Sequence, residues 1–168
     1  MDVGFNPYSK SQQLKGHQKH KDTPKIVEKR PRKRKTRTVR GRTIPTAKVR
    51  SAISKKDYNK AIETFGETCV ICNNPHIEMH HVRFRSQQGR GGYRNLMPLC
   101  KEHHMKAHKE RSFAVELKEE RESIYGKWYW ADKFDLFQEN LIPNTTEKAF
   151  EKFMEEEGER LAKKSNEL

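Results

Sequence analysis

Apolar side chains recur at helical spacing in the segment that follows Ser54. Their positions are i, i+3, i+4 and i+7, so a helix would place them on one face. Ser54, with Asp57 three residues later, resembles a helix-capping pair, and Gly66 is suited to end the helix. We therefore predict a helix over residues 54–65 whose aromatic stripe packs into the core. The stripe consists of Tyr58, Ala61, Ile62 and Phe65.

Helical spacing returns after Ser112 and continues through the C-terminal region. Gly126 is expected to break the first helix before the aromatic run at 128–130, and Pro143 to end a short amphipathic helix. Residues 144–146 can cap a last helix. Each helix has one apolar face, so we expect these helices to be structural. Their apolar faces contain Phe113, Leu117, Ile124 and Trp128, and then Phe150, Phe153, Met154 and Leu161.

Between residues 67 and 109 the helical pattern is lost, and the short apolar pieces there cannot bury a core of their own. The same stretch has the spacing of a structural zinc site, since two pairs of residues are each separated by a two-residue gap. Such a gap lets a tight turn direct both ligands to one ion, and Zn²⁺ favours thiolate with imidazole. We predict that zinc supplies the missing stability. The four ligands would be Cys69, Cys72, Cys100 and His103.

The positive charge of the chain is concentrated at its N-terminal end. Residues 1–52 hold 16 Lys and Arg against 3 Asp and Glu, whereas residues 53–168 hold 20 of each, so the arm accounts for the net charge of +13. With almost no apolar periodicity, residues 1–52 are predicted to be a disordered basic arm that binds nucleic-acid phosphates. A solvated linker and a localisation signal remain alternatives. The most basic run includes Lys33, Arg34, Lys35 and Arg37.

Neither a secretory signal nor an apolar run of membrane-spanning length is visible, so we expect a cytoplasmic protein without a membrane partner. Three cysteines cannot close into a complete disulfide framework, which again favours metal binding.

Four further histidines are more than a zinc site needs. His80 and His81 fall in an apolar, β-branched stretch that predicts a strand, where neighbouring side chains point to opposite sides. One can then face a metal ion and the other a substrate. His104 and His108, four residues apart in a predicted helix, share a face.

The motifs CVIC, MHHVRF, GYRNLMPLC and KEHHMKAH together resemble the zinc-containing members of the HNH nuclease family, over Cys69 to His108. The resemblance implies a β-hairpin and a following helix around one catalytic divalent ion, the ββα-metal arrangement. It implies that His81 is the general base, and that Asn95 fixes the hairpin loop and helps to orient the base.

The resemblance also assigns ligands to the catalytic ion. His80 takes a position where many members have Asp, and His104 matches the second ligand. For His108 a third ligand, a phosphate contact and a helix-surface residue remain open. Two imidazoles without a clear carboxylate predict activity with Mn²⁺, Co²⁺ or Ni²⁺ as well as with Mg²⁺. Family association suggests a bacterial or phage-infected cell and a phage, mobile-element or restriction setting.

Hydrolysis of a phosphodiester needs an activated water, neutralised phosphate charge and a stabilised leaving 3′ oxygen. A neutral imidazole suits the first task and the divalent ion the other two.

Four arginines around the predicted hairpin loop can clamp phosphates beside the scissile bond, although each can also be a solvated surface charge. They are Arg83, Arg85, Arg90 and Arg94.

These patterns predict a small α+β protein in three parts. Residues 1–52 form the basic arm, residues 53–111 the zinc-containing nuclease domain with its leading helix, and residues 112–168 a helical extension. The expected activity is hydrolysis of DNA, most simply double-stranded. A zinc-stabilised DNA-binding or adaptor protein without catalysis, and a nuclease for RNA or branched DNA, are the alternatives.

Overall fold

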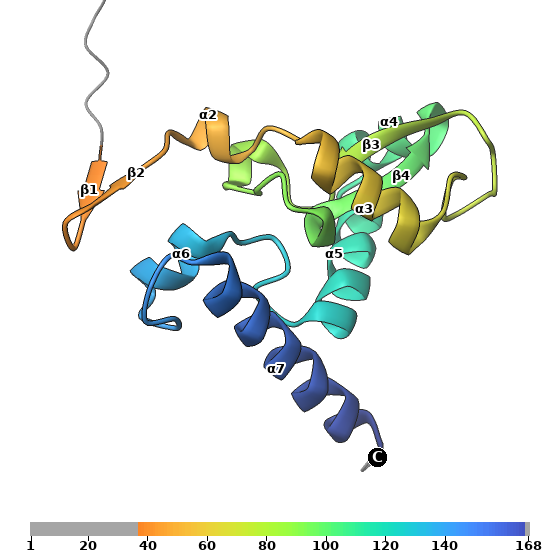
Figure 1. Cartoon of the computed structure of the whole chain (residues 1–168). Coiled ribbons are helices and arrows are strands. Elements are labelled where there is room, and N and C mark those ends of the chain that lie inside the picture. The colour runs from red at the N-terminus through yellow and green to blue at the C-terminus, as the bar shows by residue number, and fades with distance from the viewer. Residues whose placement is uncertain (1–36, 167–168) are drawn as a thin grey trace, which may run out of the picture. The chain divides into compact units, whose positions relative to one another are not determined.

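The computed structural model of the chain describes residues 37–166 (Figure 1). These residues form a small α+β unit, as the sequence predicts, and it contains helices and two small antiparallel sheets. Lys33, Arg34 and Lys35, and with them most of the predicted basic arm, lie outside the described residues. In the part of the chain that is described, no helix has the length and apolar character that crossing a membrane requires.

Regular structure begins before the predicted helix at Ser54. Strands β1 (Arg37–Val39) and β2 (Arg42–Ile44) pair as an antiparallel hairpin, and the short helix α2 (Ala47–Arg50) follows. The expectation of a disordered arm up to residue 52 is therefore wrong for residues 37–50. Each element is too short to produce a periodic pattern in the sequence. The turn depends on positive φ angles of 48° and 75° at Arg40 and Gly41, as two-residue hairpin turns often require.

Helix α3 (Lys55–Phe65) confirms the predicted capping. The Ser54 hydroxyl oxygen accepts a hydrogen bond from the Asp57 backbone N–H, and Gly66 ends the helix with a φ of 89°. The predicted core stripe is only partly correct. Ala61 is fully buried where α3 packs against β4 and η2, but Tyr58, one turn nearer the start of the helix, is 41% exposed.

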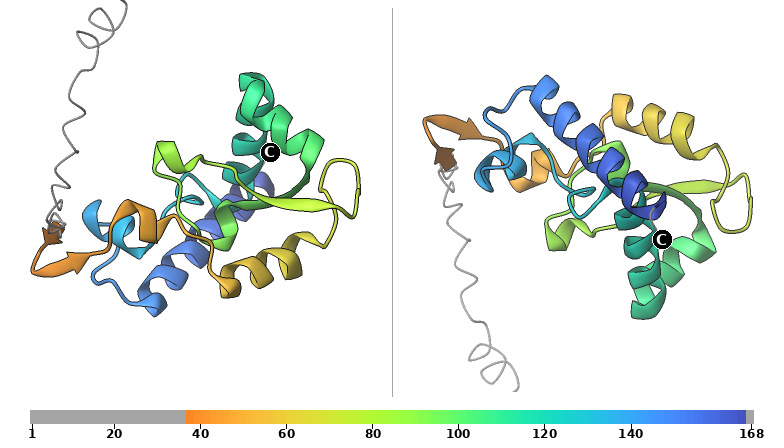
Figure 2. Two further views of the ribbon diagram at one scale, coloured as in Figure 1. Left: turned by 90° about the horizontal axis from the view of Figure 1, so that it is seen from above. Right: turned by 90° about the horizontal axis from the view of Figure 1, so that it is seen from below.

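An antiparallel hairpin and a helix form the centre of the described fold (Figure 2). Strand β3 (Ile77–His81) pairs with β4 (Leu96–Cys100), and helix α4 (Lys101–Lys109) begins directly after β4. Two short 3₁₀ turns, η1 (Arg85–Gln87) and η2 (Tyr93–Asn95), lie in the loop between the strands. All five residues of β4 are buried, because the hairpin packs against α3 on one side and α4 on the other.

Three helices complete the described chain, and α7 packs along α5 and α6 (Figures 1 and 2). Helix α5 (Arg111–Tyr125) ends at Gly126 as predicted, and α7 (Glu147–Asn166) follows the predicted Asn144–Thr146 cap. Helix α6 (Lys133–Gln138) ends earlier than Pro143, contrary to the prediction, because Asn140 takes a positive φ of 61° that interrupts the helix. Its N-terminus carries a capping box made by Asp132 and Asp135.

Candidate metal centres and catalytic site

The predicted zinc ligands converge from three elements. Cys69 and Cys72 lie in the turn after α3, Cys100 ends β4, and His103 lies in the first turn of α4. Their ligand atoms are all within 4.8 Å of one another. The Sγ atoms of Cys72 and Cys100 are 3.7 Å apart, close to the separation of about 3.8 Å that two thiolates take on a tetrahedral Zn²⁺ with bonds of about 2.3 Å.

The remaining contacts within this cluster agree with a single ion. The Nδ1 atom of His103 lies 3.2 Å from the Sγ atom of Cys100 and 3.7 Å from that of Cys69. Burial opposes ionisation of Cys69, but hydrogen bonds from backbone N–H groups outweigh it and lower the pKa of this thiol to about 6. A thiolate is the form that binds metal. The predicted Cys₃His cluster is therefore confirmed as a group that fits a metal ion such as zinc.

A second cluster of ligands contains only histidines. His80 on β3 and His104 and His108 on α4 place ring nitrogens within 4.8 Å of one another. Their ring centroids are 5.0 Å apart for His80 and His104, 5.2 Å for His80 and His108, and 5.0 Å for His104 and His108. The role of His108 was open in the sequence, and the geometry places it with the two predicted ligands.

His80 is the buried member of this histidine cluster. Its side chain is 1% exposed, and neither ring nitrogen has a hydrogen-bond partner among the described residues. Leaving a buried polar group unpaired costs about 1–3 kcal/mol, which a bound metal ion would offset. Burial, followed by the neighbouring histidines, lowers the pKa of His80 to about 3. The ring is thus held in the neutral form, which is the form that coordinates metals.

His104 is oriented by a carboxylate that sequence reasoning missed. Its Nδ1 atom lies 2.6 Å from the Glu78 Oε2 atom, so Nδ1 donates to the carboxylate and Nε2 is left to face the cluster. The sequence did contain a signal for this contact, because Glu78 precedes His80 by two positions on a strand and so lies on the same face.

His81 lies outside the group of three clustered histidines and is fixed by the backbone. Its Nε2 atom lies 3.0 Å from the carbonyl oxygen of Ser51. A carbonyl can only accept, so Nε2 carries the proton and the Nδ1 atom of the neutral ring is a free acceptor. Burial lowers the pKa of His81 most, the hydrogen bond to Ser51 opposes this, and the Arg85 charge adds to the lowering.

All four of these histidines line one cavity of about 440 Å³. Phe84 forms part of its wall and stacks on His108, with ring centroids 5.0 Å apart. Arg85 lies at the same cavity, where its Nε atom donates to the Ser51 hydroxyl at 3.2 Å. Imidazole nitrogens, one exposed cation and open space are thereby brought to one place.

Asn95 fixes the loop of the hairpin, as predicted for it. Its side chain is fully buried, and its Oδ1 atom accepts from the Arg83 N–H at 2.8 Å. Its Nδ2 atom donates to the carbonyl oxygens of Arg83 at 3.2 Å and Arg90 at 2.8 Å. Gly89 is required for this closure, because a Cβ atom there would lie 1.7 Å from the Arg83 oxygen.

A network of ion pairs holds the segment that contains Ser51. Arg50 makes a bidentate contact with Asp132, at 2.7 and 2.6 Å, and also reaches Asp135 at 2.6 Å. On the other side, the Gly91 N–H donates to the Arg50 carbonyl at 3.0 Å, and a Cβ at Gly91 would lie 2.1 Å from the Ala52 oxygen. The position of the Ser51 carbonyl thus depends on α6 and on the loop before β4.

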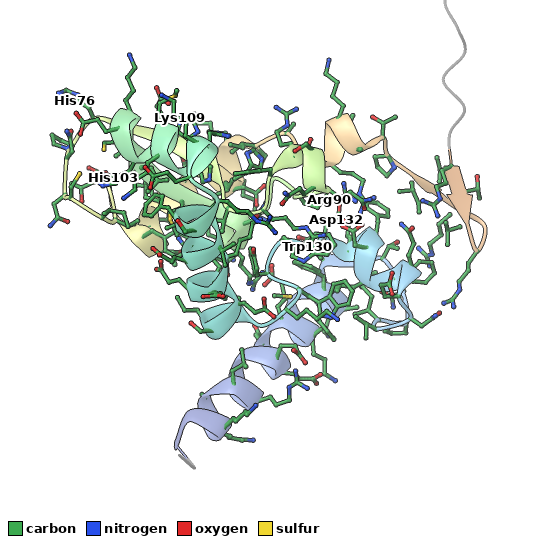
Figure 3. The ribbon with its side chains drawn as sticks, turned by 180° about the vertical axis from the view of Figure 1, so that it is seen from behind. His76, Arg90, His103, Lys109, Trp130 and Asp132 are labelled. Carbon is green, nitrogen blue, oxygen red and sulfur yellow. The ribbon has the colours of Figure 1, made fainter. Side chains whose placement is uncertain are left out.

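Two of the four arginines predicted to clamp phosphates are used inside the fold. Arg90 is buried and bonds Asp135 in a bidentate pair at 2.7 and 2.8 Å, and Arg94 is buried against Glu151 at 2.6 Å. The prediction is therefore corrected for Arg90 and Arg94, which tie the hairpin loop to α6 and α7. Figure 3 shows Arg90 gathered with Asp132 and Trp130, away from His103 on α4.

The other predicted contacts remain on the surface. Arg85 is exposed, and Arg83 is half-buried with its guanidinium 3.8 Å from the centroid of the Trp130 ring. Arg37 is exposed on β1.

Comparison of the chain with family models, with curated proteins and with solved structures finds no significant match, so any function assigned to the chain depends on the geometry of this site.

Proposed function

We propose that this protein is a metal-dependent endonuclease of the HNH type that hydrolyses phosphodiester bonds in DNA. The observation that carries the proposal is the convergence of His80, His104 and His108 beside His81 in one cavity. Three imidazoles whose ring nitrogens lie within 4.8 Å of one another are a ligand set, and the fourth is oriented as a proton acceptor.

The order of elements around these residues supports the proposal. Strands β3 and β4 pair and α4 follows, which is the order that the sequence resemblance implies for a ββα-metal nuclease. Asn95 ties the loop together between the strands, in the role that the resemblance gives it. The Cys₃His cluster lies at the far end of the hairpin, where Cys100 and His103 join β4 to α4.

In the proposed reaction, the Nδ1 atom of His81 takes a proton from water as the water oxygen attacks phosphorus. The bond between phosphorus and the 3′ oxygen breaks, that oxygen takes up a proton, and a 5′-phosphate and a 3′-hydroxyl result. His80, His104 and His108 would hold a divalent ion, which would supply positive charge beside the phosphate and the departing oxygen. General base catalysis of this kind contributes about 10²–10⁴-fold.

The charge of the chain favours a polyanionic substrate. The basic arm carries the excess positive charge, and Arg85 adds a cation at the cavity itself. Contacts of this kind bind phosphates without regard to base sequence. Imidazole ligands favour Mn²⁺, Co²⁺ or Ni²⁺, with Mg²⁺ also to be tested.

Supercoiled plasmid incubated with the purified protein and a series of divalent ions tests the proposal. We expect cleavage by the wild-type chain and a loss of at least about 100-fold in His81→Ala. His76→Ala is the matched control, because His76 is an exposed histidine outside the cavity and should leave cleavage unchanged. Intact plasmid with every ion would favour the binding or adaptor alternative, and cleavage of RNA or junctions alone would correct the substrate.

A further inference from the structure

A second cavity is lined by the hairpin loop, by α5 and by the segment between α5 and α6, and it has a different chemistry. It has a volume of about 420 Å³, which suits a nucleotide. The indole rings of Trp128 and Trp130 line it, with centroids 5.7 Å apart, and these are the only tryptophans in the sequence. Both rings are half-buried, so part of each remains open.

Three cations surround the tryptophans. Arg83 lies over the Trp130 ring at 3.8 Å, Lys127 lies 5.6 Å from the centroid of Trp128, and Lys118 lines the same wall. Glu122 is the acidic residue of the lining. Burial, and then the charges of Arg83 and Arg111, lower the pKa of Lys118. Basic side chains therefore outnumber acidic ones in the lining of this cavity.

Short contacts connect this cavity to the histidine cavity. Lys118 donates to the Gln87 side-chain oxygen at 3.0 Å, and its Nζ atom also lies 5.3 Å from the centroid of Phe84. Phe84 in turn stacks on His108. Arg83 follows His81 by two positions along the chain. The side chains of Phe84 and Lys118 therefore link the histidine cavity to the tryptophan cavity.

We infer that the tryptophan cavity binds an unpaired nucleotide that flanks the phosphate held at the histidines. The base would stack on indole, and its phosphate would contact Arg83 and Lys118. An indole face is open to a base only after that base has left its own stack, which favours a single-stranded or distorted region over intact duplex. The position of the nucleic-acid strand in this inference rests on the proposed function. Binding of a nucleotide in the tryptophan cavity does not.

Intrinsic fluorescence provides a direct readout, because both tryptophans lie in the cavity. The full chain carrying His81→Ala, without added divalent ion, is titrated with a single-stranded adenine hexamer. The controls are an abasic hexamer of the same charge and a blunt-ended DNA hairpin whose loop is abasic, so that it has no unpaired base. We expect saturable quenching by the adenine hexamer, and little by the abasic strand or the hairpin, because only a free base can stack.

Variants of the cations test the site without disturbing the core against which both tryptophans pack. Lys118→Gln should weaken the affinity for the adenine hexamer, measured by quenching, by about fivefold, which is the effect of one phosphate contact near water. Lys164→Gln, which changes an exposed lysine on α7, should weaken it by less than twofold.

Three outcomes would overturn the inference: no quenching by the adenine hexamer, equal quenching by the abasic strand or the hairpin, or equal effects of the two lysine variants. Plasmid cleavage by the wild-type chain with any of these results would leave the proposed nuclease function standing. Quenching as expected, without cleavage under any ion, would support the nucleotide site and remove the nuclease.

Discussion

The Nε2 atom of His81 is bonded to the carbonyl oxygen of Ser51, a residue thirty positions earlier in the chain, at 3.0 Å. Ser51 is buried and follows Arg50, whose guanidinium is held by Asp132 and Asp135. The orientation of the proposed base therefore depends on α6, far outside the hairpin that carries the base.

Replacing Arg50 tests this dependence. Arg50→Met should lower kcat by about 10- to 100-fold, because a small misplacement of a reacting group has effects of that size. In a His81→Ala background the same change should have no further effect on kcat. Glu151→Gln weakens a different ion pair, with Arg94, and should leave kcat within about twofold. Equal losses in Arg50→Met and Glu151→Gln would reduce the Arg50 network to a purely structural role.

The carboxylate of Glu78 should strengthen metal binding without touching the ion. It orients His104 through a 2.6 Å contact, and loss of such a partner typically lowers metal affinity by 10–100-fold. We expect that reduction for Co²⁺ in Glu78→Gln, measured by calorimetry on zinc-loaded protein. Glu102→Gln, which alters an exposed carboxylate on α4, should bind Co²⁺ as the wild type does. An unchanged affinity in Glu78→Gln would exclude the orienting role.

Cys72 allows the structural metal to be tested with little loss of packing, because its side chain is exposed. Cys72→Ala should lose about one zinc per chain and most of its folding stability, since zinc binding in small domains contributes on the order of 10 kcal/mol. Elemental analysis and circular dichroism measure the two effects. Ile71→Ala, at the neighbouring exposed position, should retain both zinc and fold. A stable, zinc-loaded Cys72→Ala protein would contradict the site.

Asp135 should make stability sensitive to acid. Burial opposes its ionisation, but Arg90 and Arg50 outweigh this and lower the pKa of Asp135 below the ordinary value for an aspartate. A lowered pKa means that the contribution to stability is complete above about pH 5 and is lost as pH falls below 4. Asp135→Asn should therefore be about 3 kcal/mol less stable at pH 7.

Urea denaturation of both proteins across pH measures this effect as a difference. Protonation of the metal ligands is common to the two proteins and cancels. The difference between wild type and Asp135→Asn should shrink as pH falls from 5 towards 3. A difference that stays constant with pH would show that Asp135 contributes nothing through its charge.

The ordered segment before α3 changes what a deletion of the basic arm should do. Removing residues 1–36 should weaken DNA binding and flatten its salt dependence, while cleavage at low salt survives. Removing residues 1–50 should also lower kcat by at least about 10-fold, because Arg50 is lost. Binding measured against salt concentration, with plasmid cleavage alongside, separates the two deletions. An unchanged salt slope after removal of residues 1–36 would exclude the arm from DNA binding.

Local patterns in the sequence determined much of this protein. The capped helix at 55–65, the Cys₃His spacing and the strand bearing His80 and His81 all depend on residues a few positions apart, and the structure has each of them. Helical spacing likewise placed His104 and His108 on one face. Such features are set by backbone geometry, which a single sequence displays directly.

Only the tertiary structure decided which charged groups line the histidine cavity and which form ion pairs inside the fold. Arg90 and Arg94 looked the same in sequence as Arg85, yet they pair with acids 45 and 57 residues away. The contact of His81 with Ser51 and the place of His108 were decided in the same way. Pairing across such distances depends on how helices and loops pack, and no local period records it.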